Sequence, residues 1–98
     1  MAKKPSVSVI ISLHKSSQLR DLLDCIRGLL KQDVDVGFEI IVVVDHNAGL
    51  FGRVSRMFKP LGIKVVLNDT GVNGHTACMN LGALHSRGEI ICFLDVDT

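Results

Sequence analysis

Two aspartates, Asp95 and Asp97, follow the apolar run EIICFL of residues 89–94 and stand at the end of the sequence. On an extended backbone, side chains two positions apart point to the same side, so both carboxylates would face one ligand. Two like charges held that close repel each other unless a cation or several hydrogen-bond donors neutralise them. Carboxylate oxygens suit Mg²⁺ or Mn²⁺, which retain water and bridge to substrate phosphates. The pair therefore predicts a metal-assisted diphosphate site, although two exposed aspartates after a strand are also a common surface feature.

Polar residues also follow three earlier apolar runs. These segments read SLHKSS (12–17), DHNAG (45–49) and NDTGVNGH (68–75). Asp45 comes directly after the second apolar run, as Asp95 comes after the fourth. Gly71 and Gly74, on either side of Asn73, could let the backbone approach a ligand closely, or they could be plain turn residues.

The elements that must position these residues can be predicted from the apolar pattern. Four apolar runs indicate β-strands over residues 6–12, 38–44, 63–67 and 89–94. Between them, apolar residues recur at spacings of three and four, which indicates a helix in each gap. Ser16 or Ser17 would cap the first helix, and Gly88 would end the third. The residues expected to face inward are Leu19, Leu22, Leu23, Ile26, Leu29 and Leu30, then Leu50, Val54, Met57 and Phe58, and finally Cys78, Leu81 and Leu84.

The order β-α-β-α-β-α-β predicts an α/β fold with a doubly wound, mostly parallel sheet. Its crossovers would be right-handed and its helices would cover both faces. Strands that are apolar at nearly every position support this, because both of their faces must be buried. In such a sheet, ligands bind beyond the carboxyl ends of the strands. The polar segments would therefore meet at one edge, which is the main functional signal in the sequence.

The composition narrows the class of protein. The 98 residues fit one domain, 1–98, and a hydrophobic fraction of 47% suffices for a packed core. A net charge of +1, with no tryptophan or tyrosine, gives no reason to expect nucleic acid as a partner. No apolar run reaches the roughly 18 residues of a membrane span, and the start has no signal-peptide pattern. Cys25, Cys78 and Cys92 each lie in an apolar pattern and fit reduced core cysteines of a cytoplasmic protein.

Several common catalytic motifs are missing from the sequence. There is no G-x-G-x-x-G after the first strand, which disfavours a dinucleotide site of the NAD type, and there is no P-loop. Ser12 lacks the G-x-S-x-G elbow of a serine nucleophile. His14, His46 and His75 would reach the ligand edge, and both metal ligation and an ordinary polar-loop role are open interpretations for them.

Nearly the whole chain resembles the N-terminal, nucleotide-binding half of a family 2 glycosyltransferase with the Rossmann-like GT-A fold. The segment VSVIIS resembles the opening strand of that family, and FEIIVVVDHN resembles the strand that leads into its D-D-G-S segment. The stretch GHTACMNLGALHSRGEIICFLDVD resembles the family's run from its Gly and Asn-x-Gly landmarks to its D-x-D motif.

The resemblance implies a role for each candidate residue. Ser12 and His14 would border the nucleotide base, and Asp45 would hydrogen-bond it. Asp95 would reach the ribose and the metal region, and Asp97 would be the direct ligand of Mg²⁺ or Mn²⁺ on the diphosphate. The nucleotide-binding set is then Ser12, His14, Asp45, Asn47, Asn73 and Asp95, and the metal-binding set is Asp95 and Asp97.

The chain departs from the family pattern at three places. Val44 replaces the first aspartate of D-D-G-S, and His46 with Asn47 replaces its Gly-Ser. Lys15 stands where asparagine is frequent, and Met79 stands where a basic residue often helps to hold the diphosphate.

The activity implied by the resemblance is metal-dependent, inverting transfer of a sugar from a nucleotide sugar, with a UDP-sugar expected, to a glycan or lipid acceptor. In the family, the catalytic base follows the D-x-D motif, so no catalytic residue is expected within the chain and the base is expected beyond Thr98. The chain would then be the donor-binding part of a longer enzyme and inactive alone.

Two alternatives stay open. A nucleotidyltransferase-like enzyme is disfavoured by the glycine-free first loop, and a non-catalytic nucleotide-binding or assembly module is favoured by Met79 and by the missing base. We also expect self-association through the apolar terminal strand.

Overall fold

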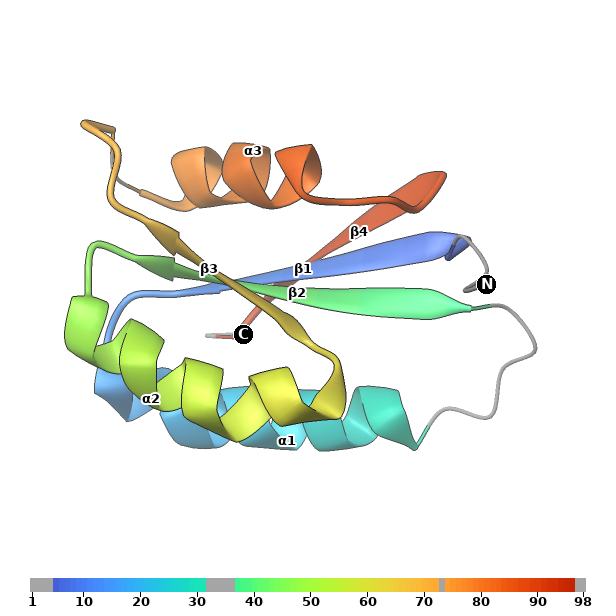
Figure 1. The fold of residues 1–98 in the computed structure, drawn as a ribbon, viewed down its shortest axis with the longest axis horizontal. Coiled ribbons are helices and arrows are strands. Elements are labelled where there is room, and N and C mark those ends of the chain that lie inside the picture. The colour runs from blue at the N-terminus through green and yellow to red at the C-terminus, as the bar shows by residue number, and fades with distance from the viewer. Residues whose placement is uncertain (1–4, 32–36, 73, 97–98) are drawn as a thin grey trace.

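Four parallel strands form a single sheet at the centre of the molecule (Figure 1). The structure is a computed structural model that describes residues 5–31, 37–72 and 74–96. The strands are β1 (Val7–Leu13), β2 (Phe38–Asp45), β3 (Lys64–Asn68) and β4 (Ile90–Asp95), in the spatial order β3-β2-β1-β4. All three strand pairs are parallel, which confirms the predicted parallel sheet.

The helices cover both faces of this sheet, so the doubly wound α/β fold is confirmed. Helices α1 (Leu19–Leu30) and α2 (Ala48–Phe58) lie on one face, and α3 (His75–Leu84) lies on the other (Figure 1). Two short 3-10 turns, η1 (Ser16–Gln18) and η2 (Lys59–Leu61), precede α1 and follow α2. None of the described helices is long and apolar enough to cross a membrane.

Alternate residues of the central strands fill two separate core layers. On β2, Val42 and Val44 pack in the layer beneath α1 and α2, whereas Ile41 and Val43 pack in the smaller layer beneath α3. All four side chains are completely buried. Burying one such side chain stabilises a fold by about 1.5–3 kcal/mol, so this strand contributes to both faces at once. The burial explains why the strand is apolar at consecutive positions.

Several local sequence predictions are wrong in detail. Each predicted strand is displaced by one residue at one or both of its ends, within the usual spread of boundaries. Neither serine caps α1 through its side chain; instead, the buried Gln18 accepts hydrogen bonds from the backbone N–H groups of His14 (2.8 Å) and Lys15 (3.1 Å). Gln18 has the longer side chain, and it folds back over the turn that the serines occupy.

Some residues predicted to face inward are exposed. Leu30, Met57 and Leu84 are exposed, and Leu84 retains 82% of its accessible surface; each lies in the last turn of its helix. The cysteine prediction also fails in part. Cys78 is buried and Cys25 is half-buried, but Cys92 on the edge strand β4 is exposed.

Gly88 does not end α3, contrary to the sequence prediction. The helix stops at Leu84, and its C-cap is His85, which keeps right-handed helical backbone angles. Gly88 instead lies against β1, where its N–H donates to the Ser8 hydroxyl at 2.8 Å. Glycine is needed at this position because the backbone of residue 88 lies close to β1, and not because a helix ends there.

Candidate functional site

The carboxyl ends of the four strands meet at one edge of the sheet, where Ser12 and Asp45 of the predicted ligand residues lie. Ser12 on β1 is the register partner of Asp95 on β4, and Asp45 on β2 is the partner of Asn68 on β3. The first turn of α3 opens at the same edge, since the Ser12 hydroxyl lies 2.9 Å from Nδ1 of His75 in a hydrogen bond. The parallel topology therefore brings together the side chains of Ser12 and His75, which are 63 residues apart in the sequence.

The carboxylate of Asp45 is the centre of this cluster. Its Oδ2 accepts a hydrogen bond from the backbone N–H of Gly74 at 2.9 Å. Its Oδ1 accepts from Nδ2 of Asn68 at 3.0 Å and from Nδ1 of His46 at 2.5 Å. Partial burial raises the pKa of this carboxyl, but the three hydrogen bonds outweigh that effect and hold the pKa below its usual range. Asp45 is therefore an anion fixed in one orientation.

Asn68 organises the loop that follows β3. It is 1% exposed, and its Nδ2 donates to the backbone carbonyl of Val72 at 3.1 Å as well as to Asp45. Its Oδ1 accepts from the hydroxyl of Thr70 at 2.8 Å. The sequence places Asn68 within a polar loop and indicates no role for it. A buried amide directly after an apolar strand was the available signal, because such a group needs partners on both of its ends.

His46 joins the loops that follow β2 and β3. Nδ1 of its ring meets Asp45, and Nε2 lies 2.6 Å from the backbone carbonyl oxygen of Thr70. The hydrogen bond to Asp45, followed by that to Thr70, raises the pKa of the imidazole, and the nearby charge of Asp69 adds to the shift. Of the two interpretations left open for His46, its partners in the structure favour a role in polar loop contacts.

The first loop is held by different contacts. Asn47 begins α2 as its N-cap, since its Oδ1 accepts from the N–H of Leu50 at 3.1 Å. Its Nδ2 donates to the backbone carbonyl of His14 at 3.3 Å. The amide of Asn47 thus ties the loop after β1 to the start of α2, whereas the side chain of His14 stays exposed.

The predicted metal ligands fall largely outside what the structure describes. Asp97, Thr98 and Asn73 lie outside the described residues, and for Asp95 the backbone alone is described, as the last residue of β4. Among the described side chains, no three His, Cys, Asp or Glu gather closely enough to hold a metal ion. The metal site at Asp95 and Asp97 therefore stays a prediction, and so does a catalytic base beyond Thr98.

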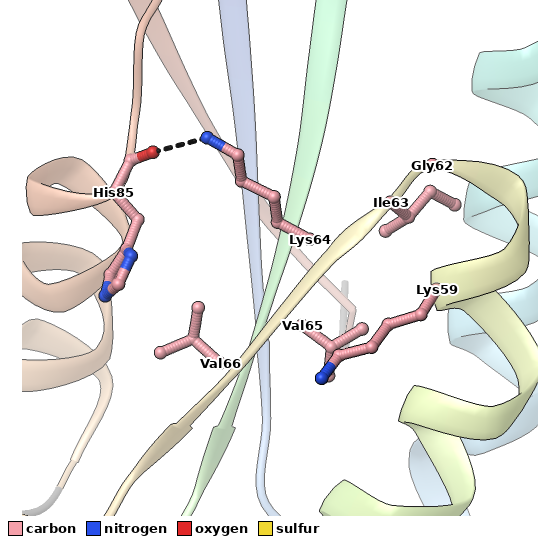
Figure 2. Close-up of a pocket in the computed structure, with 7 residues that line it drawn as sticks. All are labelled: Lys59, Gly62, Ile63, Lys64, Val65, Val66 and His85. Atoms are coloured by element: carbon pink, nitrogen blue, oxygen red, sulfur yellow. Dashed lines mark hydrogen bonds between the residues drawn. The ribbon is translucent and has the colours of Figure 1, made fainter.

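A shallow hollow of about 430 Å³ runs along the outer edge of β3, away from the predicted ligand edge (Figure 2). Its walls come from the turn after α2, the first three residues of β3 and the end of α3. The ammonium of Lys64 crosses it to donate to the backbone carbonyl of His85 at 3.0 Å (Figure 2). None of the predicted site residues lines this hollow. The lining residues are Lys59, Gly62, Ile63, Lys64, Val65, Val66 and His85.

The model of the family described as Glycosyl transferase family 2 matches residues 8–98, which is almost the whole chain. The chain belongs to glycosyltransferase family 2. The resemblance inferred from the strand and D-x-D segments is thereby confirmed, and the family implies a nucleotide-sugar donor. Among curated proteins, none matches the chain significantly.

Proposed function

We propose that this family 2 glycosyltransferase chain is the donor-binding part of an inverting, metal-dependent enzyme. The donor would be a nucleotide sugar, with UDP as the expected nucleotide, and the acceptor a glycan or a lipid. The observation that carries the proposal is the oriented, ionised carboxylate of Asp45 at the carboxyl edge of the sheet. It stands within a family match that extends through the aspartate pair.

Asp45 is the proposed acceptor for an N–H group of the nucleotide base. Its Oδ1 already accepts two hydrogen bonds and its Oδ2 accepts one from Gly74. A carboxylate offers about four lone-pair positions, so Oδ2 can accept one more donor. Ser12 on β1 and His14 in the loop after it are the residues proposed to border the base. Asn47 supports the edge indirectly, since its side chain is engaged by Leu50 and His14.

Asp95 and Asp97 are the proposed ligands of Mg²⁺ or Mn²⁺. Two carboxylates fit a hard divalent cation that completes its shell with water and phosphate oxygens. The register of β4 supports this, because it places Asp95 opposite Ser12 at the ligand edge. When bound, the metal would offset the negative charge on the leaving diphosphate.

The catalytic base of the proposed transfer is assigned to none of the described residues. We propose that it follows Thr98 in a longer enzyme, as the family pattern implies, so this chain alone is expected to lack transfer activity. A cytoplasmic location stays a prediction.

Binding of UDP is expected to tighten about tenfold or more when Mn²⁺ or Mg²⁺ is added, which corresponds to one or two charge-assisted contacts. Asp97→Ala should abolish this gain while leaving metal-free binding intact. Asp45→Asn should weaken binding with and without metal, because the contact to the base does not involve the ion. Isothermal titration calorimetry measures each affinity.

Asp24→Asn serves as the control for that titration, since Asp24 is an exposed aspartate in the middle of α1. It should bind UDP like the unmutated chain. An affinity for UDP that is the same with and without metal in the unmutated chain would contradict the role given to Asp97.

We also propose that the chain self-associates through β4. The two edges of the sheet differ: β3 begins with Lys64, whereas Ile90, Ile91 and Phe93 on β4 are apolar and exposed. Lysine on an edge strand opposes pairing with another strand, and an apolar edge without charge favours it. A second copy offers the same apolar edge, so the two strands can pair with each other.

Phe93→Lys is expected to shift the chain from a dimer towards a monomer, as measured by analytical ultracentrifugation. Leu84→Lys is the matched control, because Leu84 is more exposed than Phe93 but lies on α3, away from the strand edge. It should leave the association unchanged. A purely monomeric unmutated chain at high concentration would refute the proposal.

A further inference from the structure

Both ring nitrogens of His46 face oxygen atoms that can only accept hydrogen bonds. Nδ1 lies 2.5 Å from Oδ1 of Asp45, and Nε2 lies 2.6 Å from the carbonyl oxygen of Thr70. An ionised carboxylate and a backbone carbonyl have no proton to donate. A neutral imidazole carries one N–H and one lone pair, so it satisfies one of these contacts and opposes the other. The doubly protonated ring satisfies both.

The backbone of His46 is also unusual. Its φ of 49° is the only positive value of a non-glycine residue within the described parts of the chain. The left-handed conformation is unfavourable for most side chains and persists where the surroundings impose it. Here it directs the ring from the end of β2 toward the loop that follows β3, where Thr70 lies 24 residues further along the chain.

We propose that the imidazolium form of His46 is the positioning residue of the nucleotide site, holding the carboxylate of Asp45 and the turn at Thr70 in the arrangement that binds the base. This inference rests on the proposed function of Asp45. His46 need not touch the nucleotide, because it acts through the orientation of Asp45. The donor site therefore depends on pH through one histidine.

The charged groups around the ring agree with this assignment. From β2, the anion of Asp45 faces Nδ1; from the loop after β3, the charge of Asp69 also favours the protonated ring. On α3, His75 is directed to Ser12, and burial with the charge of Asp45 raises the pKa of the Cys78 thiol to about 11, so the thiol is neutral. The charges of Asp45 and Asp69 thus both stabilise the imidazolium.

The direction of the pH dependence follows from the proton count. The contacts to Asp45 and Thr70 raise the pKa of His46 above its ordinary value of 6.5. The two-sided contact is therefore complete below pH 6.5 and is lost as the pH rises through the folded-state pKa. Loss of one of the two ring hydrogen bonds, which together hold Asp45 and the turn at Thr70, should weaken UDP binding about fivefold.

The test combines two readouts on the same protein. NMR titration should give the His46 ring a pKa above about 6.5, and the amide signal of Gly74, which donates to Asp45, should shift with the same midpoint. Metal-free UDP affinity, measured between pH 6.5 and 8.5, should fall with that midpoint. The absence of metal keeps metal binding at Asp95 and Asp97 out of the comparison.

His46→Asn is the decisive variant, because asparagine tolerates the left-handed backbone but carries no ionisable proton. This variant should bind UDP more weakly at pH 6.5 and should lose the part of the pH dependence of UDP affinity that comes from His46. The titration of UDP itself affects both proteins equally. His85→Gln, on the far end of α3, should keep the unmutated pH profile.

The outcomes separate this inference from the proposed function. Three results would overturn the inference and leave the nucleotide site intact. They are a His46 ring pKa at or below the ordinary value, a Gly74 amide signal that does not shift as the ring titrates, and an unchanged pH profile of UDP affinity in His46→Asn. Absence of UDP binding at every pH overturns the proposed function, and the ring titration with the Gly74 amide then still decides whether His46 holds Asp45.

Discussion

Gly88→Ala is expected to lower the free energy of unfolding by about 3 kcal/mol, the upper part of the usual range for overpacking a tight contact. A Cβ atom at Gly88 would lie 2.6 Å from the backbone nitrogen of Ser8 and 2.8 Å from the carbonyl carbon of Val7. These atoms belong to β1, a central strand that is paired on both sides. The strand cannot withdraw without breaking its pairing, so the added methyl group must displace the entry to β4.

Urea denaturation followed by circular dichroism measures this loss. Gly28→Ala is the matched control, because Gly28 lies within α1 and its Cβ would meet no atom within 4 Å. Alanine in a helix interior is favoured over glycine by about 1 kcal/mol, so Gly28→Ala should stabilise the chain slightly. If the free energy of unfolding of Gly88→Ala lay within about 0.5 kcal/mol of that of the unmutated chain, the close contact with Ser8 would not restrict this position to glycine.

The fold could be predicted from the sequence because its main determinant is periodic. The run of apolar residues in β2 indicates burial on both faces, and the intervening helical spacings imply parallel crossovers. Local chemistry was less predictable. Gln18, and not a serine, bonds the backbone before α1, and Gly88 packs closely against β1 instead of ending α3. Both contacts depend on neighbouring residues that the apolar spacing does not identify.

The candidate site could likewise be predicted only in part. Ser12 and Asp45 could be assigned to one edge because the carboxyl ends of parallel strands must meet there. The contacts of Asn68 and His46 could not, because both side chains bond to backbone carbonyl groups of the loop after β3, whose path the apolar spacing does not specify. Asn47 illustrates the difference: it lies at the predicted edge, but its amide caps α2 and holds the first loop.

Glu39→Ala is expected to cost about 2–3 kcal/mol of unfolding free energy, because it removes the acceptor of a buried group. Glu39 on β2 accepts hydrogen bonds from the Ser8 hydroxyl and from the backbone N–H of Arg87, and it pairs with the ammonium of Lys64 at 3.2 Å. Ser8 is completely buried. Its hydroxyl in turn accepts from Gly88, so one carboxylate supports β1, β3 and the entry to β4.

The charge of Glu39 gives this network a pH dependence of known sign. Burial raises the pKa of the carboxyl, but the bonds from Ser8 and Arg87 and the ammonium of Lys64 together lower it below its ordinary value of 4.5. A carboxyl with a depressed folded-state pKa stabilises the fold above its unfolded-state pKa, and this contribution is lost as the pH falls through the folded-state value. The stability advantage over Glu39→Gln should therefore be complete above about pH 5 and shrink on acidification.

Unfolding curves of the unmutated chain and of Glu39→Gln between pH 3 and 7 test this dependence. Glu89→Gln is the control, because Glu89 is an exposed glutamate near the same end of the sheet. The free energy of unfolding of this variant should stay within about 0.5 kcal/mol of that of the unmutated chain. A constant difference between the chain and Glu39→Gln across this range would mean that the contacts to Ser8 and Arg87 do not require the charge. The entry to β4, and with it the register that sets Asp95 opposite Ser12, would then depend on shape and hydrogen bonding alone.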